Sequence, residues 1–316
     1  MLILTRSQIA GLLPFGEYVD VVESAFRAHA EGRSLPPALM HVAAPEGEFH
    51  VKAGGLLDPE PAFGLKCNGS FFQNRARYGL PNIQGLILLS SVENGRPLAV
   101  MDSMEITIHR TGAATAIAAR YLARPESSDV TVCGCGNQGR IQLRAVCHSL
   151  PIRKAFAYSI NRDNARAFAE TMSRELAISV EAVDAIAPCD VLLTCTPAKR
   201  PVVTLADVRP GTFIAAIGAD SHGKQELDAS LTAASAVYGD LRAQCAAVGE
   251  FHYAPDADFR GELGELIVGK VRGRANAEEI TIFDSTGTAL QDVAAAVAVY
   301  RKARAAGIGL EIDLAL

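Results

Sequence analysis

A glycine-rich turn between a strand and a helix constrains the fold more than any other feature of this sequence. The motif Gly134-Cys-Gly136-Asn-Gln-Gly139 directly follows the apolar run VTVC and opens the helical segment QGRIQLRAVCHSL. In dinucleotide-binding units, the first glycine permits the tight turn, the second lets the backbone approach a pyrophosphate, and the third allows close helix packing. We therefore predict a dinucleotide-binding βαβ unit at residues 130–150. The alternative is a glycine-rich turn without a ligand.

Short apolar runs alternate with helical segments after Pro125. The expected strands are DVTVCG, KAFAYSI, AISVEAV, DVLLTCT, TFIAAIG, SAVYGD and EITIFD, with helices up to Ser149 and over NARAFAETMSREL. Such alternation is typical of a parallel, doubly wound sheet. The predicted fold class is therefore α/β, with a Rossmann sheet as its main part.

The first third of the chain has a different pattern. An amphipathic helix is expected near residues 17–31, followed by the β-rich runs FHVKAGG, AFGLKCNGSFF, NIQGLILLSS and PLAVMDS. Asn94-Gly95 predicts a type I′ hairpin turn between the last two runs. This part should form a mostly antiparallel sheet. Ala-rich helices are expected from residue 109 to Pro125 and over 287–306, with hinges near 106–115 and around 285.

Composition narrows the class of partner. With 316 residues, 49% of them hydrophobic, the chain can bury a large core, and its net charge of −5 gives no basic surface for nucleic acid or anionic membrane. No apolar run reaches about 18 residues and the N-terminus does not resemble a signal peptide. We expect a cytoplasmic protein that acts on a small molecule.

The cysteines and histidines predict no metal site. Seven cysteines, an odd number, lie mostly inside apolar segments and are expected to be reduced: Cys67, Cys133, Cys135, Cys147, Cys189, Cys195 and Cys245. Neither they nor the seven histidines show the spacing of a zinc-ligand motif.

The end of the second expected strand bears on the choice of cofactor. An acidic residue there binds the ribose hydroxyls of NAD, whereas small polar or basic residues accommodate the 2′-phosphate of NADP. Here the run KAFAY continues into Ser159-Ile-Asn161-Arg162. This favours NADP over NAD. The alternative is that Arg162 only begins a solvated helix.

An aspartate follows the expected strand TFIAAIG. The stretch from Gly218 to Gln225 nearly matches a P-loop, but Gln225 occupies the position of the Mg²⁺-binding Ser or Thr, which excludes a nucleotide triphosphatase. Open α/β sheets bind ligands at the carboxyl ends of their strands. Asp220 is therefore a candidate to exchange a proton with a substrate amine or to activate water. The alternative is a turn-forming or helix-capping aspartate.

Three cations form a further candidate site. Lys52 and Lys66 lie within expected strands, and Arg110 opens the Ala-rich helix. Lysine is rarely buried without an anionic partner, and a substrate carboxylate would supply one, with Arg110 able to hold it bidentately. The alternative is that either lysine faces solvent. No GxSxG motif or Cys-His arrangement suggests covalent hydrolytic chemistry.

Together these motifs resemble the ornithine cyclodeaminase and mu-crystallin family. The resemblance spans nearly the whole chain and is carried, in order, by Lys66, GLPNIQGLILL, ENGRPLAVMDSMEIT, Arg110-Thr-Gly-Ala-Ala, GCGNQG, LLTCTPAKRP, GADSHGKQEL and FDSTGTALQD. The family includes ornithine and lysine cyclodeaminases, alanine and other amino-acid dehydrogenases, and imino-acid reductases. All of them handle an amino or imino acid at a nicotinamide ring.

The resemblance implies roles for individual residues. Lys66 and Arg110 match positions that contact the substrate carboxylate, Arg110 also lying near the cofactor, and Asp220 matches the family's catalytic aspartate. Positions around the dinucleotide are matched by Asn82, Thr111, Asn137, Gln138, Thr196, Lys224 and Ser285. The implied organisation is a substrate-binding and dimerisation domain of residues 1–112 with 290–316, and a Rossmann domain of residues 113–289. A homodimer is expected.

One segment departs from the family pattern. Many members carry a substrate-binding arginine near the stretch LPPALMH, where this chain has Ala38. Lys52 stands where relatives often have a neutral residue such as methionine, and we hypothesise that it replaces the missing charge. The identity of the substrate depends on this segment.

The resemblance leaves three functions open. The first is an NAD(P)-dependent oxidoreductase that interconverts a small 2-amino acid and its imine by hydride transfer at the α-carbon. The second is a redox-neutral cyclodeaminase, which needs the same aspartate, cations and cofactor. The third, of another class, is a mu-crystallin-like NADPH-binding protein, against which the retained Asp220, Lys66 and Arg110 argue.

Overall fold

The computed structural model describes residues 1–314, which divide into two compact units. The first unit comprises Met1–Ala113 together with the chain from Thr288 onward, and the second comprises Ala114–Gly287. The first boundary falls within helix α4 (Met104–Leu122). Each unit has its own sheet.

A seven-stranded sheet forms the first unit, in the order β17-β1-β6-β5-β4-β3-β2. Its strands are β1 (Leu2–Leu4), β2 (Ser34–Ala44), β3 (Gly47–Leu56), β4 (Ala62–Ser70), β5 (Ile83–Ser90), β6 (Pro97–Asp102) and β17 (Leu310–Glu311). Strands β3 to β6 form the predicted antiparallel meander, β2 extends it, and β1 pairs parallel with β6. Two short helices, α1 (Arg6–Ile9) and α3 (Asn74–Tyr78), belong to the loops.

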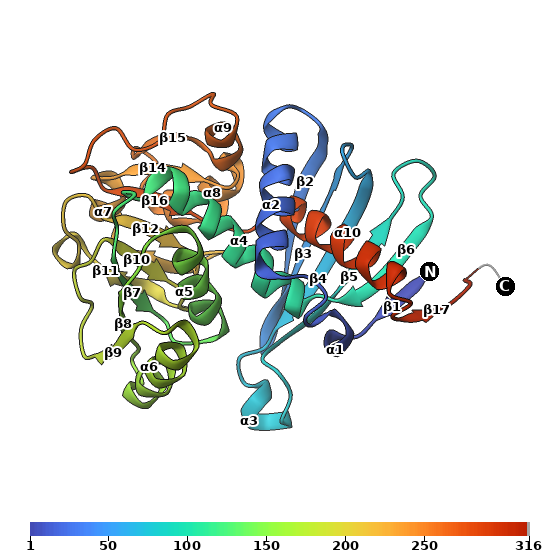
Figure 1. The fold of residues 1–316 in the computed structure, drawn as a ribbon, viewed down its shortest axis with the longest axis horizontal. Coiled ribbons are helices and arrows are strands. Elements are labelled where there is room, and N and C mark those ends of the chain that lie inside the picture. Colours follow the sequence, from blue (N-terminus) through green and yellow to red (C-terminus); the bar gives the residue numbers. More distant parts are fainter. Residues whose placement is uncertain (315–316) are drawn as a thin grey trace. The chain divides into compact units, whose positions relative to one another are not determined.

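Helices α2 (Phe15–Ala30) and α10 (Ala289–Ala305) cover one face of this sheet (Figure 1). We call the covered side the inner face and the other side the outer face. Small residues let α10 approach closely: a Cβ at Gly64 would lie 2.7 Å from Cγ2 of Val293, and one at Gly54 would lie 3.1 Å from Cβ of Ala289. Along β4, buried and half-buried residues alternate, so Gly64 and Lys66 share the inner face.

The predicted hairpin between β5 and β6 is present, but its predicted turn type is wrong. Gly95 has a φ of +73°, whereas Asn94 does not adopt the positive φ that a type I′ turn requires at both central residues. The loop is longer than two residues and is closed by hydrogen bonds between Ser91 and Arg96 and from the Gly95 N–H to the Ser91 carbonyl. The Asn94 side chain instead accepts the Arg96 N–H.

The departing segment LPPALMH lies in β2, a strand at the edge of the sheet. No strand was predicted here, and proline is unusual in strands since it removes a ladder hydrogen bond. The structure accommodates Pro36 and Pro37 by a register shift between Leu35 and Ala38. An edge strand tolerates such prolines since one of its sides has no pairing partner within the sheet.

The second unit contains an eight-stranded parallel sheet in the order β15-β14-β16-β12-β10-β7-β8-β9. Its strands are β7 (Asp129–Cys133), β8 (Lys154–Tyr158), β9 (Ser179–Val183), β10 (Val191–Thr194), β12 (Phe213–Ala216), β14 (Ala236–Gly239), β15 (Asp258–Glu262) and β16 (Thr281–Asp284). This confirms the predicted doubly wound α/β class, and every strand predicted after Pro125 is present.

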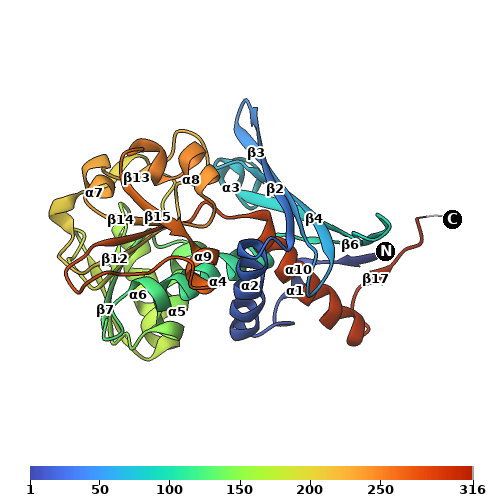
Figure 2. The same ribbon diagram turned by 90° about the horizontal axis from the view of Figure 1, so that it is seen from above.

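Helices α5 (Asn137–Ser149) and α6 (Arg162–Leu176) lie on one side of this sheet, and α7 (Ala229–Ala233) and α8 (Arg242–Val248) on the other (Figure 2). The remaining elements are α9 (Leu263–Ile267), the 3-10 turns Leu205–Asp207 and Glu250–Tyr253, and a two-stranded sheet of β11 (Lys199–Val203) and β13 (Gln225–Leu227). Strand order reverses between β7 and β10, the kind of position at which doubly wound sheets bind ligands.

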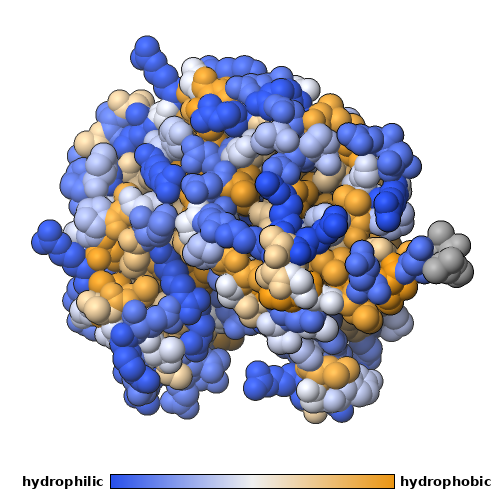
Figure 3. Space-filling view, turned by 45° about the vertical axis from the view of Figure 1, so that its right-hand side comes forward, coloured by the Kyte–Doolittle hydropathy of each residue, from blue (hydrophilic) through white to orange (hydrophobic). Residues whose placement is uncertain are grey.

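Within residues 1–314, no helix is both long enough and apolar enough to span a membrane. Figure 3 shows hydrophilic side chains interspersed with apolar ones over one face of the molecule.

Candidate active site

A buried ion cluster lies between the sheet and α10 in the first unit. Lys66 of β4 places its Nζ 2.7 Å from Oδ2 of Asp292, and Arg110 of α4 places its Nε 2.9 Å from Oδ1 of the same carboxylate. Arg110 also donates to Oε1 of Gln291 at 2.8 Å. All three charged side chains are at most 5% exposed. The structure therefore brings together two of the predicted carboxylate-binding cations on one acidic residue of α10.

Lys52 extends this cluster along the inner face. It lies directly opposite Lys66 in the β3–β4 register and is buried, so the alternative of solvent-facing lysines is excluded. Burial, the charge of Arg110 and the charge of Lys52 lower the pKa of Lys66 to about 7, although Asp292 opposes the shift. Burial would raise the pKa of Asp292, but Arg110 and Lys66 hold it below its ordinary value. Lys66 and Arg110 thus bind one ionised carboxylate, and Lys52 adds a further positive charge beside it, which suits the site to an anion.

Sequence reasoning missed Asp292 and Gln291 as members of this site. Both lie in the quoted run FDSTGTALQD, but an aspartate near the start of a helix is ordinarily a solvated residue that interacts with the helix dipole. The available signal was the Ala-rich character of the helix around it, which predicts burial on several sides.

Two residues that the resemblance placed near the cofactor make local contacts in the first unit. The Thr111 hydroxyl donates to the Thr107 carbonyl within α4, at 2.6 Å. Asn82 accepts the Arg75 N–H through its side chain and the Phe71 N–H through its carbonyl, which ties together the loop that carries α3. Neither belongs to the ion cluster, and their cofactor roles stay predictions.

The glycine motif of the second unit has the geometry of a dinucleotide-binding turn. Gly134 has a φ of +109°, which favours glycine, and a Cβ on Gly139 would lie 2.1 Å from the Gly134 carbonyl oxygen. A Cβ on Gly136 would meet no atom within 4 Å. The first and third glycines are therefore required by the protein's own packing, whereas the second leaves open space beside the N-terminus of α5, where a phosphate can bind.

A cavity of about 500 Å³ opens at the carboxyl ends of β7, β8 and β10, where the strand order reverses. Its walls combine the glycine turn with the segments that follow β8 and β10: Cys133, Gly134, Cys135, Gly136, Tyr158, Ser159, Ile160, Asn164, Cys195, Thr196, Pro197, Ala198 and Val202. Of the predicted cofactor residues, it brings together Gly134, Gly136, Ser159 and Thr196. Sequence reasoning missed Asn164, which lies in the first turn of α6. The position and size of the cavity fit part of a dinucleotide.

Asn161 and Arg162 are absent from the walls of this cavity. The Asn161 side chain caps α6 by accepting the N–H groups of Asp163 and Asn164. Arg162 begins the helix and pairs with Asp184 at 3.1 Å, with both side chains exposed. This arrangement matches the alternative in which Arg162 only begins a solvated helix. No carboxylate lies among the wall residues.

Asp220 lies in the loop after β12 and does not cap a helix. Its Oδ1 is 2.6 Å from Nζ of Lys224, so the structure brings the predicted catalytic aspartate and a predicted cofactor residue into one ion pair. The Asp220 side chain is 40% exposed, which leaves it accessible to a ligand.

Glu226, which sequence reasoning missed, holds this loop in place. Its carboxylate accepts the Thr196 N–H at 2.6 Å and the Gly218 N–H at 2.7 Å, which joins the loops after β10 and β12. Burial raises the pKa of Glu226. We regard Glu226 as a positioning residue for Thr196 and Asp220.

The remaining predicted cofactor residues lie at the ends of second-unit elements. Asn137 and Gln138 form the start of α5, and the Gln138 side chain accepts from Gln142 at 3.3 Å. Ser285 directly follows β16 and is 2% exposed, and its Oγ has no hydrogen-bond partner among residues 1–314. A buried hydroxyl without a partner is costly, so Ser285 is suited to a bound ligand.

Comparison with known proteins shows which family the chain belongs to. The sequence model of the Ornithine cyclodeaminase/mu-crystallin family matches residues 1–307. An alanine dehydrogenase of Archaeoglobus fulgidus is 39% identical, over 98% of each chain. The structure of an archaeal alanine dehydrogenase dimer with bound NAD superimposes with a TM-score of 0.95 at 38% identity, over 99% of each chain.

A second solved structure is a Delta(1)-pyrroline-2-carboxylate reductase of Thermococcus litoralis in complex with NADH and L-proline. It superimposes with a TM-score of 0.93 at 33% identity, over 99% of this chain and all of the other. These matches agree with the motif resemblance, the fold and the glycine turn. The chain belongs to the ornithine cyclodeaminase/mu-crystallin family.

Proposed function

We propose that this chain is a nicotinamide-dinucleotide-dependent oxidoreductase that interconverts a small 2-amino acid and its imino form. The observation that carries the proposal is the buried cluster in which Lys66 and Arg110 pair with the carboxylate of Asp292 and Lys52 lies opposite Lys66. Such a cluster suits a carboxylate ligand, and a glycine turn with the geometry of a dinucleotide site lies in the same chain. Relatives with bound NAD, or with NADH and L-proline, support the same reaction class.

In this proposal the protein positions the substrate and moves its proton. Lys66 and Arg110 bind the carboxylate, and Lys52 adds a cation beside Lys66, which compensates for the missing family arginine. Asp220 exchanges a proton with the substrate nitrogen, and Lys224 pairs with its carboxylate. The nicotinamide, when bound, supplies or accepts the hydride at the α-carbon.

We propose that NADPH is accepted at least as well as NADH. The cavity walls contain Ser159 and no carboxylate that would bind the ribose hydroxyls of NAD and repel a 2′-phosphate. The preference is measured as the ratio of kcat/KM for the two cofactors. A strong preference for NADH would contradict this part of the proposal.

The test follows the absorbance of reduced nicotinamide with amino acids, with cyclic imines, and with keto acids plus ammonia. Net oxidation or reduction is the expected result, and Asp220→Asn should lose most of it while still binding cofactor. Ammonia release from ornithine without net redox would instead identify a cyclodeaminase. Tight NADPH binding with no turnover of any substrate would identify a binding protein.

We also propose that the protein is a cytoplasmic homodimer. The outer face of the first unit's sheet carries exposed apolar side chains, among them Met40, Val42, Phe49 and Leu86. Exposed apolar patches commonly mark protein interfaces, and an archaeal relative is described as a dimer. All seven cysteines are free, as expected in a reducing compartment.

A further inference from the structure

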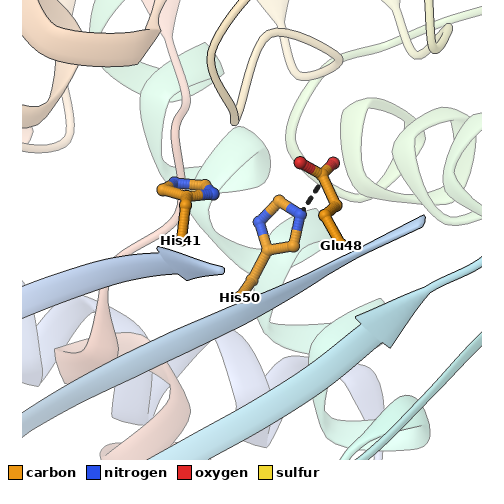
Figure 4. Close-up of side chains that lie close together, drawn as sticks. All are labelled: His41, Glu48 and His50. Carbon is orange, nitrogen blue, oxygen red and sulfur yellow. Dashed lines mark ion pairs between the residues drawn. The ribbon is translucent and has the colours of Figure 1, made fainter. Parts of the chain in front are cut away.

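Three potential metal ligands meet on the inner face of the first unit's sheet. His41 of β2 lies directly opposite His50 of β3, and Glu48 precedes His50 by two residues, so it lies on the same face. Figure 4 shows the three side chains rising from the two strands toward one another. The sequence predicted no metal site, because the ligands come from two strands at a spacing that matches no metal motif.

The geometry of the cluster suits ligation better than simple pairing. One ligand atom from each residue lies within 4.8 Å of the other two. Nε2 of His50 is 2.9 Å from Oε1 of Glu48, yet this nitrogen makes no hydrogen bond of acceptable geometry. The two atoms thus lie close together, but their orientation is not that of a hydrogen-bond donor and its acceptor. Two ligands of one tetrahedral zinc ion are similarly placed, roughly 3.4 Å apart.

The histidine rings are held in fixed positions. Their centroids are 4.5 Å apart at an interplanar angle of 72°, an edge-to-face arrangement, and His50 is only 6% exposed. Because β2 and β3 pair in continuous antiparallel register from Ala38 to Ala44, neither ring can shift along the sheet without breaking ladder hydrogen bonds. Ligands fixed in this way lose little conformational entropy on binding an ion.

We propose that His41, Glu48 and His50 form a binding site for a divalent transition-metal ion of the zinc class. Two imidazole nitrogens and one carboxylate oxygen match the donor set that such ions take in proteins. Three protein ligands leave a fourth position for water or for an anion. The proposal does not rest on the proposed redox function.

The position of Lys52 gives the proposal a specific electrostatic consequence. Lys52 follows His50 by two residues on the same face, so its charge repels a bound cation. Removing this charge should tighten metal binding. Lys52→Met therefore has an expected effect opposite to that of the ligand variants.

The experiment uses the full chain, stripped of metal by a chelator and titrated with zinc chloride by calorimetry. One zinc ion per chain is expected, with affinity reduced by at least about tenfold in His50→Gln, His41→Gln and Glu48→Gln. His252→Gln is the matched control, because His252 is an exposed histidine of the second unit. Lys52→Met should bind zinc more tightly than the unchanged chain.

Cobalt(II) absorption separates this site from the seven free cysteines. Visible d–d bands without a thiolate charge-transfer band are expected, and they should vanish in His50→Gln. Circular dichroism establishes that each variant is folded. A thiolate band, equal zinc affinity in all ligand variants, weaker binding by Lys52→Met, or no binding by the folded unchanged chain would each overturn the proposal.

Discussion

The ionisation of Lys66 predicts how catalytic efficiency depends on pH. Burial, together with the charges of Arg110 and Lys52, lowers the pKa of this lysine to about 7. The protonated ammonium binds a carboxylate and the neutral amine does not, and kcat/KM reports ionisations of the free enzyme. We therefore expect kcat/KM for a carboxylate substrate to fall as the pH rises through about 7.

Lys66→Arg provides the control for this prediction. A guanidinium stays protonated throughout this range, so the variant should lose the decline that Lys66 causes, whatever its absolute rate. Initial rates measured on both sides of neutrality test this. Identical alkaline declines in the two proteins would assign the ionisation to another group.

Asp292 is the carboxylate that pairs with both Lys66 and Arg110, so its removal should lower the free energy of unfolding strongly. Asp292→Asn leaves Lys66 and Arg110 buried without their shared counter-charge. Breaking a buried pair in this way costs about 3–5 kcal/mol. Urea denaturation followed by circular dichroism measures the loss in the free energy of unfolding.

Glu17→Gln is the matched control for Asp292→Asn. Glu17 pairs with Lys302 of α10 at 2.9 Å, but both side chains are largely exposed. Exposed pairs contribute about 0–1 kcal/mol, so this variant should be nearly as stable as the unchanged protein. Equal losses in the two variants would contradict the assigned role of the buried cluster.

At the scale of single residues, the basic residues of the cluster could be predicted from the sequence, but their acidic partner could not. Lysines inside strands are unusual enough to indicate an anion, which identified Lys52 and Lys66. Asp292 lies more than two hundred residues from Lys66 in the chain and has no unusual local pattern. Only the packing of α10 on β4 makes it the shared counter-ion.

At the scale of elements, substitutions at two glycines of the turn should separate an effect on folding stability from an effect on ligand binding. Gly139→Ala places a Cβ 2.1 Å from the Gly134 carbonyl oxygen, so α5 must move away from β7, at a cost of about 1–3 kcal/mol. Gly136→Ala meets open space and should leave the free energy of unfolding nearly unchanged. Its methyl group would instead enter the space proposed for a phosphate and weaken dinucleotide binding.

Two measurements on the same pair of variants test this division. Thermal unfolding in the absence of cofactor should show a lower Tm for Gly139→Ala only, and fluorescence titration with NADPH should show a higher Kd for Gly136→Ala. If Gly136→Ala bound NADPH as the unchanged protein does, the second glycine would not be the point of phosphate approach.

Elements with a strong local pattern were predictable, and those decided by neighbours were not. Parallel strands of the second unit are continuous apolar runs, because both faces of such a sheet are buried. Strand β2 was missed since its two prolines conflict with strand propensity, and its edge position overrides that conflict. The ligands of the proposed metal site lie on β2 and on its neighbour β3, so no local sequence pattern predicts that they meet.

At the scale of the whole molecule, the outer face of the first unit's sheet should mediate dimerisation. Leu86 is 56% exposed and Val42 45% exposed, and both lie on this face. A buried aspartate in an apolar interface is strongly unfavourable. Leu86→Asp or Val42→Asp should therefore convert the proposed dimer to a folded monomer in light scattering coupled to size-exclusion chromatography.

Leu205→Asp is the control for surface charge. Leu205 is also 45% exposed but lies in the second unit, in the turn after β11. This variant should remain a dimer. Dissociation caused by Leu205→Asp alone would move the interface away from the proposed face.

The sequence by itself determined the parts of this protein that depend on local geometry. The glycine turn and the alternation of strands and helices each follow from steric or solvation rules that act within a few residues. Tertiary structure decided the rest: that Asp292 joins Lys66 to Arg110, that Glu226 ties two loops together, and that His41 meets Glu48 and His50. The physical reason is that electrostatics and ligation act through space, so their partners are set by packing and register rather than by distance along the chain.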